Sequence, residues 1–484
     1  MVQALAMEIL FATTELAPYV KVGGLADVSA ALPKTLKMLG HKITLVMPRF
    51  PAFEEAGLLL ARRLTPLKLE LGEKTWDVTV FDGRLSSHVD LVLLDAPNLY
   101  DRPAVYGERG EDYPDNATRF AVFSRAVAEL ARQRSEAKQP FDVVQVNDWP
   151  TALVAKYVKD LGVPTPVILT IHNVAHQGVF PKETLPELGL AWDDFGVDGI
   201  EFYGAVNLLK QGILSADLVT TVSSTYAREI QTEAGGARLD GVLRAKGRLL
   251  GIVNGVDYGV WNPATDSNIV ARFDAEDPSN KTRSKGALQK ELGLPLDGNA
   301  PLVASVSRIV AQKGSDLVAG VIPRIVRGSE AQVVIAGEGD PGLEAKLTSA
   351  MEKTNGRGIF VRAASEALVH RIFAAADIVL VPSRFEPCGL VQMYAQRYGA
   401  VPVATSTGGL VDTVVDCDAK LETGTGFLFD EATEDALYGA TQRAIAAYGM
   451  PRWAALRRRV MRLDRGWERA ARQYEQAYRS VART

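Results

Sequence analysis

Short β-rich runs alternate with helical stretches along this chain, in two separate series. The first series supplies candidate strands at Ile9–Thr13, Ile43–Met47, Leu91–Leu94, Val143–Val146 and Val167–Ile171. The second supplies candidate strands at Leu302–Val306, Val333–Ala336, Ile359–Val361, Ile378–Val381 and Val401–Ala404. This alternation is typical of parallel sheets covered by helices. The chain is therefore expected to be an α/β protein with two parallel sheets.

The two series are separated by a stretch that has turn residues and little periodicity. It begins with Asn254-Gly255-Val256-Asp257, continues with Trp261-Asn262-Pro263 and stays polar to about residue 284. A chain of 484 residues is also too long for a single core, because about 150 residues is typical of one domain. These features predict an N-terminal domain at 1–253 and a C-terminal domain at 254–460. Residues 461–484 are expected to form a terminal helix, because their aromatic residues recur at helical spacing.

A five-residue motif recurs near the two ends of the chain, as Gly23-Gly24-Leu25-Ala26-Asp27 and Gly408-Gly409-Leu410-Val411-Asp412. Each copy reads as a glycine turn that opens a helix, a geometry that presents backbone N–H groups to a phosphate. The first copy leads into an apolar stripe over Leu25–Leu39, in which Pro33 predicts a kink or a helix that starts late. The pair indicates two domains that close on one phosphorylated ligand.

Composition excludes several classes of protein. The chain is 47% hydrophobic and 23% charged with a formal net charge of -4, which gives no reason to expect nucleic acid. It has only Cys388 and Cys417, so a disulfide framework is not expected. This cysteine content is typical of a protein in a reducing cytoplasm. No signal peptide and no apolar run of about 18 residues are evident, so neither export nor a membrane span is expected.

The usual nucleotide-binding glycine motifs are absent. Neither a Gly-x-Gly-x-x-Gly turn after the first strand nor a Gly-x-x-x-x-Gly-Lys-Ser/Thr loop occurs. Dinucleotide and P-loop chemistry are therefore disfavoured.

Two cations follow the strand at Leu302–Val306, at Arg308 and Lys313. A strand-end loop can direct both beyond the carboxyl edge of the sheet, where open α/β folds bind ligands. There they would stabilise a diphosphate as its negative charge develops. Alternatively, both are ordinary surface charges.

Glu386 lies in Pro382–Leu390, the segment after the strand at Ile378–Val381 and before a helical stretch at Gly389–Gly399. A carboxylate at this edge can hold sugar hydroxyls or act as an acid or base. The alternative is an acid stabilised by the helix dipole. Cys388 is expected to be a buried packing residue.

His172 and Asn173 follow the strand at Val167–Ile171, and His176 comes four residues later. The spacing of the histidines invites a metal interpretation, but no third ligand motif accompanies them, so none is predicted. We expect His172 to be a polar group in the cleft, and a structural histidine is the alternative. Asp148, after the strand at Val143–Val146, either approaches the same cleft or caps a helix.

Several of these segments together resemble bacterial glycogen synthases and plant starch synthases. The matching stretches are Lys21–Val28, Tyr113–Asn116, Thr170–Asn173, Asn254–Asp257, Ser307–Gly314, Arg384–Leu390 and Ser406–Leu410. The resemblance runs in register over essentially the whole chain, and its Lys-x-Gly-Gly-Leu and Glu-Pro-Cys-Gly-Leu segments are highly specific. It implies two Rossmann-like domains facing across a deep cleft, the GT-B type.

The resemblance also implies a reaction. Members of this family are retaining glucosyltransferases that move glucose from ADP-glucose to the non-reducing end of an α-1,4-glucan. They need no metal or other cofactor. This chain is accordingly expected to be a cytoplasmic glycogen synthase with ADP-glucose and glucan as its partners, and neither nucleic acid nor membrane. Its oligomeric state is not predicted.

The family's roles carry over residue by residue. Arg308 and Lys313 would neutralise the leaving diphosphate, helped by Lys21. His172, Glu386 and Asp27 would complete the catalytic set, with the carbonyl of His172 near the anomeric carbon. The remaining substrate-binding residues implied by the resemblance are Gly23, Gly24, Asp148, Asn173, Asn254, Thr407, Gly408 and Gly409.

Two departures from the family pattern keep alternatives open. The chain has Asn147-Asp148-Trp149-Pro150 where His-Asp-Trp-His is usual, which alters the polar support of Asp148. It has Ala364 where the family often carries a tyrosine that stacks on the nucleotide base. The alternatives are the same fold using UDP-glucose or a small-sugar acceptor, or a silent glucan-binding protein. The retained Lys21, Arg308, Lys313 and Glu386 together argue against the silent protein, because a binding protein does not need a leaving-group site.

The C-terminal stretch is arginine-rich, with Trp467, Tyr474 and Tyr478 at helical spacing. We expect the arginines to form a solvated face and the aromatics to pack against the body of the protein. The family resemblance implies that this helix crosses back onto the N-terminal domain. A membrane-surface or nucleic-acid helix is the less favoured interpretation.

Overall fold

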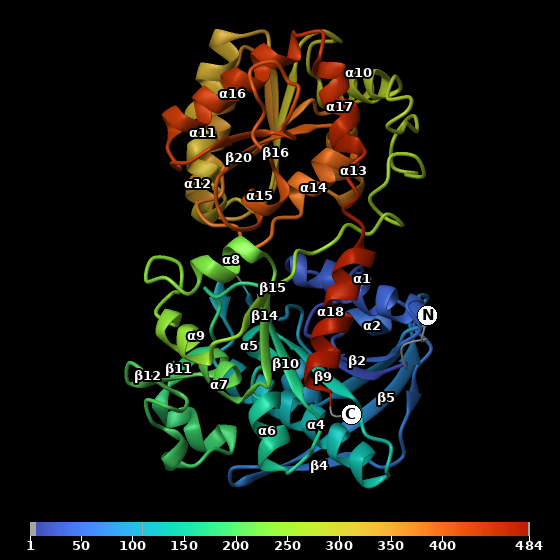
Figure 1. Cartoon of the computed structure of the whole chain (residues 1–484), viewed down its shortest axis with the longest axis vertical. Coiled ribbons are helices and arrows are strands. Elements are labelled where there is room, and N and C mark those ends of the chain that lie inside the picture. The colour runs from blue at the N-terminus through green and yellow to red at the C-terminus, as the bar shows by residue number, and fades with distance from the viewer. Residues whose placement is uncertain (1–5, 109, 483–484) are drawn as a thin grey trace. The chain divides into compact units, whose positions relative to one another are not determined.

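The computed structural model of the chain describes residues 6–108 and 110–482 (Figure 1). The chain divides into two compact units. The first comprises Met1–Val222, Ala227–Asn254 and Trp467–Thr484, and the second comprises Ser223–Tyr226 and Gly255–Gly466. The change of unit after Asn254 lies at the start of the turn-rich segment seen in the sequence.

The first unit is built on one large sheet, in the order β15-β14-β10-β9-β1-β2-β6-β5-β3, with β4 paired to β5. From β15 to β6 all neighbours are parallel, and β3, β4 and β5 add an antiparallel extension. The strands are β1 (Glu8–Ala12), β2 (Lys42–Pro48), β3 (Ala61–Arg62), β4 (Leu67–Leu71), β5 (Lys74–Arg84), β6 (Asp90–Asp95), β9 (Val143–Asn147), β10 (Val167–Ile171), β14 (Leu218–Thr221) and β15 (Leu249–Gly251).

Helices and short ribbons complete this unit. A small sheet has the order β11-β13-β12, and β7 pairs with β8. These elements are β7 (Gly107–Glu108), β8 (Glu111–Asp112), β11 (Val179–Pro181), β12 (Glu201–Phe202), β13 (Ala205–Asn207), α1 (Gly24–Met38), α2 (Ala52–Glu55), α3 (Pro97–Tyr100), α4 (Asn116–Glu136), α5 (Asp148–Thr151), α6 (Val154–Asp160), η1 (Lys182–Leu188), η2 (Trp192–Asp194), α7 (Leu208–Ser215) and α9 (Asp240–Lys246). Helix α8 (Ser224–Glu229) begins in the segment assigned to the second unit.

The second unit has a wholly parallel sheet in the order β18-β17-β16-β19-β20-β21. Its strands are β16 (Leu302–Val306), β17 (Gln332–Ala336), β18 (Gly358–Val361), β19 (Ile378–Val381), β20 (Val401–Thr405) and β21 (Phe427–Phe429). Its helices are α10 (Lys281–Leu292), η3 (Ala311–Lys313), α11 (Ser315–Gly328), α12 (Pro341–Glu352), α13 (Glu366–Ala375), α14 (Val391–Arg397), α15 (Gly408–Thr413), α16 (Glu434–Tyr448) and α17 (Trp453–Met461).

The α/β prediction is confirmed, and each predicted strand is present. Val167–Ile171, Leu302–Val306 and Ile378–Val381 have the predicted bounds. These strands are buried along their whole length or nearly so, because helices cover both faces of a parallel sheet. That burial explains why continuous apolar runs marked them in the sequence.

Helix α1 shows that a proline did not delay a helix start. It begins at Gly24 and runs through Pro33 to Met38, so the expectation of a late start was wrong. Leu25, Val28 and Leu32 are buried along it. Burial of such an apolar stripe outweighs the loss of one backbone hydrogen bond at a proline.

Helix α18 (Trp467–Val481) belongs to the first unit and contacts α1, beside which it lies in Figure 1. Trp467, Tyr474 and Tyr478 are buried, whereas Arg472 pairs with the exposed Glu468 at 2.8 Å. The aromatic stripe therefore packs and the polar face is solvated. Across the described residues, no helix is long and apolar enough to cross a membrane.

Candidate active site

In the first unit, three neighbouring parallel strands end in polar residues at one edge of the sheet. Strand β1 leads to Glu15, β9 to Asp148, and β10 to His172. The carboxyl edge of an open parallel sheet is the usual ligand-binding edge of such folds. The topology therefore brings predicted site residues from distant parts of the sequence to one place.

Asp148 holds the backbone of the residues that follow β10. Its Oδ1 accepts hydrogen bonds from the backbone N–H of His172 at 2.7 Å and of Asn173 at 3.4 Å. Its φ of 55° lies in the left-handed region, which non-glycine residues adopt mostly where the surrounding structure enforces it. Burial raises the pKa of Asp148 to about 7. The Asp148 side chain thus holds the backbone N–H groups of His172 and Asn173 and does not cap a helix.

His172 is fixed by the altered residue before Asp148. Its Nε2 lies 2.9 Å from Asn147 Oδ1, and Asn147 Nδ2 donates to the carbonyl of Ala12 at 2.9 Å. Because the Asn147 amide nitrogen is engaged there, its oxygen accepts from a His172 that is protonated at Nε2. Burial lowers the pKa of His172 to about 3, so the ring is neutral near pH 7.

The first glycine turn is tied to a carboxylate of the protein itself. Glu15 Oε2 accepts hydrogen bonds from the backbone N–H of Val22 at 3.0 Å and of Gly23 at 2.7 Å. The hydroxyl of Tyr106 donates to Glu15 Oε1 at 3.0 Å. Burial raises the pKa of Glu15. Two N–H groups of this turn are therefore already occupied by an internal anion. Beside them Lys21 Nζ pairs with Asp27 Oδ1 at 2.9 Å.

Glu15 and Tyr106 were missed by the sequence reasoning. Glu15 had a usable signal, because Thr13-Thr14-Glu15 follows a buried strand in the same way that His172 follows β10. Tyr106 had none, since it lies 91 residues from Glu15 in the sequence and meets it only through the fold.

The second unit brings together residues that follow three adjacent strands, β16, β19 and β20. Lys313 Nζ lies 2.5 Å from Glu386 Oε2, and the hydroxyl of Ser383 donates to the same oxygen at 2.8 Å. The backbone N–H of Gly409 donates to the carbonyl of Glu386 at 2.9 Å. Glu386 is buried. A cation, a carboxylate and a glycine turn thus converge at the carboxyl edge of this sheet.

Two glycines allow these loops to approach each other. Gly314 has φ 70°, and a Cβ there would lie 2.2 Å from the carbonyl oxygen of Pro382. A Cβ on Gly409 would lie 2.0 Å from the carbonyl oxygen of Cys388. Both contacts are shorter than any side chain tolerates, so glycine is required for this packing.

Glu386 does not sit at the start of a helix. The predicted helical stretch Gly389–Gly399 is shorter in the structure, where α14 begins at Val391. Glu386 precedes it by several residues and pairs with Lys313, so the dipole interpretation does not describe it. Cys388 is buried, as expected of a packing residue.

Arg308 stands apart from the Lys313–Glu386 pair. It is exposed, and its guanidinium makes no ion pair with any residue in the described ranges. It borders a hollow of about 200 Å³ at the ends of β16, β17 and β18, together with Glu338, Ala363 and Ala364. The position where the family often has a tyrosine therefore lies beside the predicted diphosphate-binding arginine.

The other predicted residues occupy element ends. Asn254 is buried, and its side-chain oxygen accepts no hydrogen bond from the residues the structure describes. Thr407 precedes α15 and donates its backbone N–H to Thr405 O at 2.9 Å, and Gly408 has φ 47°. His176 is exposed. Within residues 6–108 and 110–482, no group of three or more His, Cys, Asp or Glu side chains is placed to hold a metal ion.

Comparison with known proteins gives the same assignment over both units. The family model for the starch synthase catalytic domain matches residues 8–245, and that for glycosyl transferases group 1 matches residues 290–459. A glycogen synthase from Anaeromyxobacter dehalogenans is 42% identical and covers 98% of this chain and 100% of its own length. One from Paracidovorax citrulli is also 42% identical, covering 98% of this chain and 94% of its own.

A solved structure agrees in fold. The catalytic domain of Starch Synthase IV from Arabidopsis thaliana, bound to ADP and acarbose, has a TM-score of 0.90 and 33% identity. The match covers 99% of this chain and 100% of that one. Sucrose-phosphate synthase from Thermosynechococcus elongatus, at 19% identity and TM-score 0.62, shares the GT-B fold alone. By sequence, by family model and by fold, this chain belongs to the glycogen and starch synthase family of glycosyltransferases.

Proposed function

We propose that this chain transfers glucose from ADP-glucose to the non-reducing end of an α-1,4-glucan, with retention of the anomeric configuration and without a metal. The observation that carries the proposal is the cluster of Lys313, Glu386 and Gly409 at the carboxyl edge of the second sheet. Its relatives support the substrates: they include glycogen synthases and a starch synthase bound to ADP.

The diphosphate end of the donor is assigned to Arg308 and Lys313. Lys313 is held by a carboxylate, whereas Arg308 has an exposed guanidinium suited to bidentate contact with phosphate oxygens. As the glycosidic bond breaks, negative charge grows on the leaving diphosphate, and fixed cations stabilise that charge. This is the role that a metal ion fills in many phosphate-transfer sites.

We assign binding of the donor's glucose to polar groups that follow the carboxyl ends of strands in the two sheets. Glu386 and Asn173 would accept and donate hydrogen bonds to glucose hydroxyls. The neutral His172 ring cannot repel a developing cationic sugar, and its backbone carbonyl offers a partial negative charge. Asp148 acts as a positioning residue, because it holds the N–H groups of His172 and Asn173.

The proposal is tested by glucose transfer to glycogen, with ADP-glucose and UDP-glucose compared side by side. Incorporation of labelled glucose from ADP-glucose is expected, and β-amylase, which cleaves only α-1,4 bonds from the non-reducing end, should release the incorporated label. Activity should survive a metal chelator. No incorporation from either donor would refute the function, and a chelator-sensitive rate restored by Mg²⁺ would refute the metal-free mechanism alone.

The assigned cations are tested with matched controls. Lys313→Ala and Arg308→Ala should each lower kcat about 10²-fold or more, as the loss of a preorganised charge stabiliser does. Lys353→Ala and Arg327→Ala, which remove exposed charges from the same unit, should leave kcat near wild type. Near-normal rates in both active-site variants would show that the diphosphate binds elsewhere.

UDP-glucose as donor is a second candidate, supported by Ala364 at the hollow beside Arg308. Without an aromatic platform there, a stacking contribution of about 1 kcal/mol to base binding is absent. Ala364→Tyr should therefore lower KM for ADP-glucose by several-fold and sharpen the preference for it. An unchanged donor ratio would place the nucleotide base away from this hollow.

A further inference from the structure

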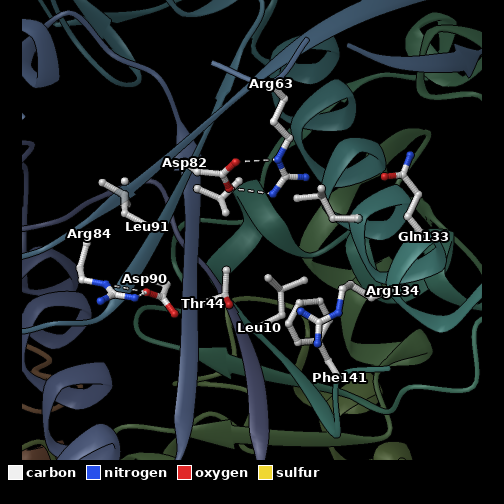
Figure 2. Close-up of a pocket in the computed structure, with 13 residues that line it drawn as sticks. Leu10, Thr44, Arg63, Asp82, Arg84, Asp90, Leu91, Gln133, Arg134 and Phe141 are labelled. Atoms are coloured by element: carbon white, nitrogen blue, oxygen red, sulfur yellow. Dashed lines mark hydrogen bonds and ion pairs between the residues drawn. The ribbon is translucent and has the colours of Figure 1, made fainter. Parts of the chain in front are cut away.

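The first unit has a second hollow, of about 470 Å³, that the proposed reaction does not use (Figure 2). Its floor includes Leu10, Thr44 and Asp90, which are neighbours in register on β1, β2 and β6 and share one face of the sheet. Leu10 lies within β1, whereas Glu15 follows the end of that strand. The hollow is therefore on a face of the sheet and separate from the carboxyl-edge site. Its volume is in the range of small-molecule sites.

Three arginines border this hollow, and each has a fixed orientation. Arg63 forms a two-point pair with Asp82, through Nε and Nη2 at 2.7 Å each. Arg84 directs Nε at 2.9 Å and Nη2 at 2.8 Å to Asp90 Oδ1. Figure 2 shows these two pairs and, across the hollow, Arg134 lying over the ring of Phe141. Its guanidinium carbon is 4.7 Å from the ring centroid.

Arg134 is oriented by two further contacts. Its Nε donates to the carbonyl of Gln139 at 2.8 Å, and its Nη2 lies 2.5 Å from Glu8 Oε2. In all three arginines, then, Nε and Nη2 are engaged by the protein. The Nη1 groups of Arg63, Arg84 and Arg134 have no partner among residues 6–108 and 110–482.

The hydrogen-bonding capacity left in the hollow is strongly biased toward donors. Each Nη1 carries two N–H groups, and the hydroxyl of Thr44 is likewise unengaged among the described residues. Both oxygens of Asp82 bind Arg63, so the acceptors left unengaged among the described lining side chains are Oδ2 of Asp90, Oε1 of Gln133 and the Thr44 hydroxyl oxygen, fewer than the six N–H groups of the three Nη1 atoms. A neutral sugar would need acceptors and donors in similar number. An acceptor-rich anion fits the bias better.

Beside the polar groups, the hollow offers apolar surface. Leu10, Val92, Leu130 and Phe141 line it and are buried. A hollow of about 470 Å³ is much larger than inorganic phosphate, so an organic phosphate would fill it more completely. Preoriented guanidinium groups recognise phosphate oxygens geometrically as well as by charge.

We propose that this hollow is a binding site for a small phosphate-bearing metabolite, held by the Nη1 groups of Arg63, Arg84 and Arg134. The site is independent of the donor site, because none of its residues lies at the carboxyl edge of either sheet. The proposal therefore stands or falls separately from the assigned glucosyl transfer.

Binding is measured by isothermal titration of the full-length chain carrying Arg308→Ala and Lys313→Ala, which disables the proposed diphosphate site. Pyrophosphate and a hexose bisphosphate are the probes. One saturable site is expected to remain for at least one probe, and tighter binding of the hexose bisphosphate would identify an organic ester as the natural class. No saturable binding of either probe at millimolar concentration would overturn the proposal.

The location is tested by adding Arg63→Gln and Arg84→Gln to that chain. Removing charged donors from a phosphate should weaken binding by about tenfold or more for each arginine. Arg62→Gln removes the same charge one residue away, outside the hollow, and should leave affinity unchanged. Equal affinity in the Arg63/Arg84 and Arg62 variants would refute the site. Thermal unfolding shows whether each variant folds, and exposed ion pairs such as Arg63–Asp82 contribute little to stability.

Discussion

The two copies of Gly-Gly-Leu-x-Asp share a sequence and a helix start, but they differ in their partners. In the first, the N–H groups of Val22 and Gly23 bind the Glu15 carboxylate. In the second, the N–H of Gly409 binds a backbone carbonyl, that of Glu386. The motif therefore specifies a local geometry, and the surrounding fold decides which acceptor fills it. An anion-binding turn in a sequence can be satisfied by the protein's own carboxylate.

The aspartates of the two copies differ as well. Asp27 pairs with Lys21 in the first unit. Asp412 accepts from the backbone N–H of Thr225 at 2.9 Å and from its hydroxyl at 2.6 Å, within the second unit. One aspartate thus orients a cation, and the other fixes the start of α8. Substitutions that act on one copy and not on the other will separate these roles.

The largest difference between the two copies is expected when Gly409→Ala is compared with Gly23→Ala. A Cβ on Gly409 would lie 2.0 Å from Cys388 O, so the backbone must move, whereas the nearest atom to a Cβ on Gly23 is 4.0 Å away. Gly409→Ala should lower the unfolding free energy by about 3 kcal/mol and disturb Glu386, with a matching loss of kcat. Gly23→Ala should lower the free energy of unfolding only slightly. Equal denaturation midpoints would mean that the two turns are packed alike.

Glu15→Ala tests the internal anion of the first turn. The variant loses three hydrogen bonds to a buried carboxylate, so a loss of about 2 kcal/mol in unfolding free energy is expected. Glu73→Ala, an exposed glutamate of the same unit, is the control and should be near neutral. Chemical denaturation gives both values. A neutral Glu15→Ala would show that water replaces the carboxylate at no cost.

The raised pKa of Asp148 predicts a pH dependence specific to the first unit. Between about pH 4 and pH 7 the unfolded chain ionises this carboxyl while the folded chain keeps its proton. Wild type should therefore lose about 4 kcal/mol of stability relative to Asp148→Asn as the pH rises through that window, and no more above it. Urea denaturation across pH 4–8 measures the difference. Parallel curves for the two proteins would contradict the buried-acid assignment.

The smallest effects are expected from replacing the aspartate of each motif copy. One replacement should change stability, and the other should change activity. Asp412→Ala should lower stability by about 1 kcal/mol, as the loss of a helix-capping contact does, with little change in kcat. Asp27→Ala removes a part-exposed ion pair, so stability should hardly change while kcat/KM falls about tenfold. If both variants changed the free energy of unfolding and kcat/KM in the same way, the two aspartates would not have different roles.

The strands of the two parallel sheets could be predicted from the sequence better than the strands of the antiparallel extension. Strands such as Val167–Ile171 are buried on both faces and appear as unbroken apolar runs. Strand β4 (Leu67–Leu71) alternates buried and exposed residues, a weaker signal that the two series did not include. The expectation of a late helix start at Pro33 was wrong, because burial of the apolar stripe of α1 outweighs the local cost of a proline inside a helix. Lys313 and Glu386 were placed at strand ends correctly, yet their pairing depends on β16 and β19 being neighbours, which only the topology establishes.

The position of α18 has a consequence for biosynthesis. Because α18 packs on α1 within the first unit, that unit cannot be completed until the residues through Val481 have left the ribosome. At typical synthesis rates, the interval between Asn254 and Val481 is on the order of 10–50 s. During that time, other proteins and chaperones can reach the apolar surface on which Tyr474 and Tyr478 will pack. That surface belongs to α1 and its neighbouring elements. A stop codon before Trp467 would leave it exposed permanently.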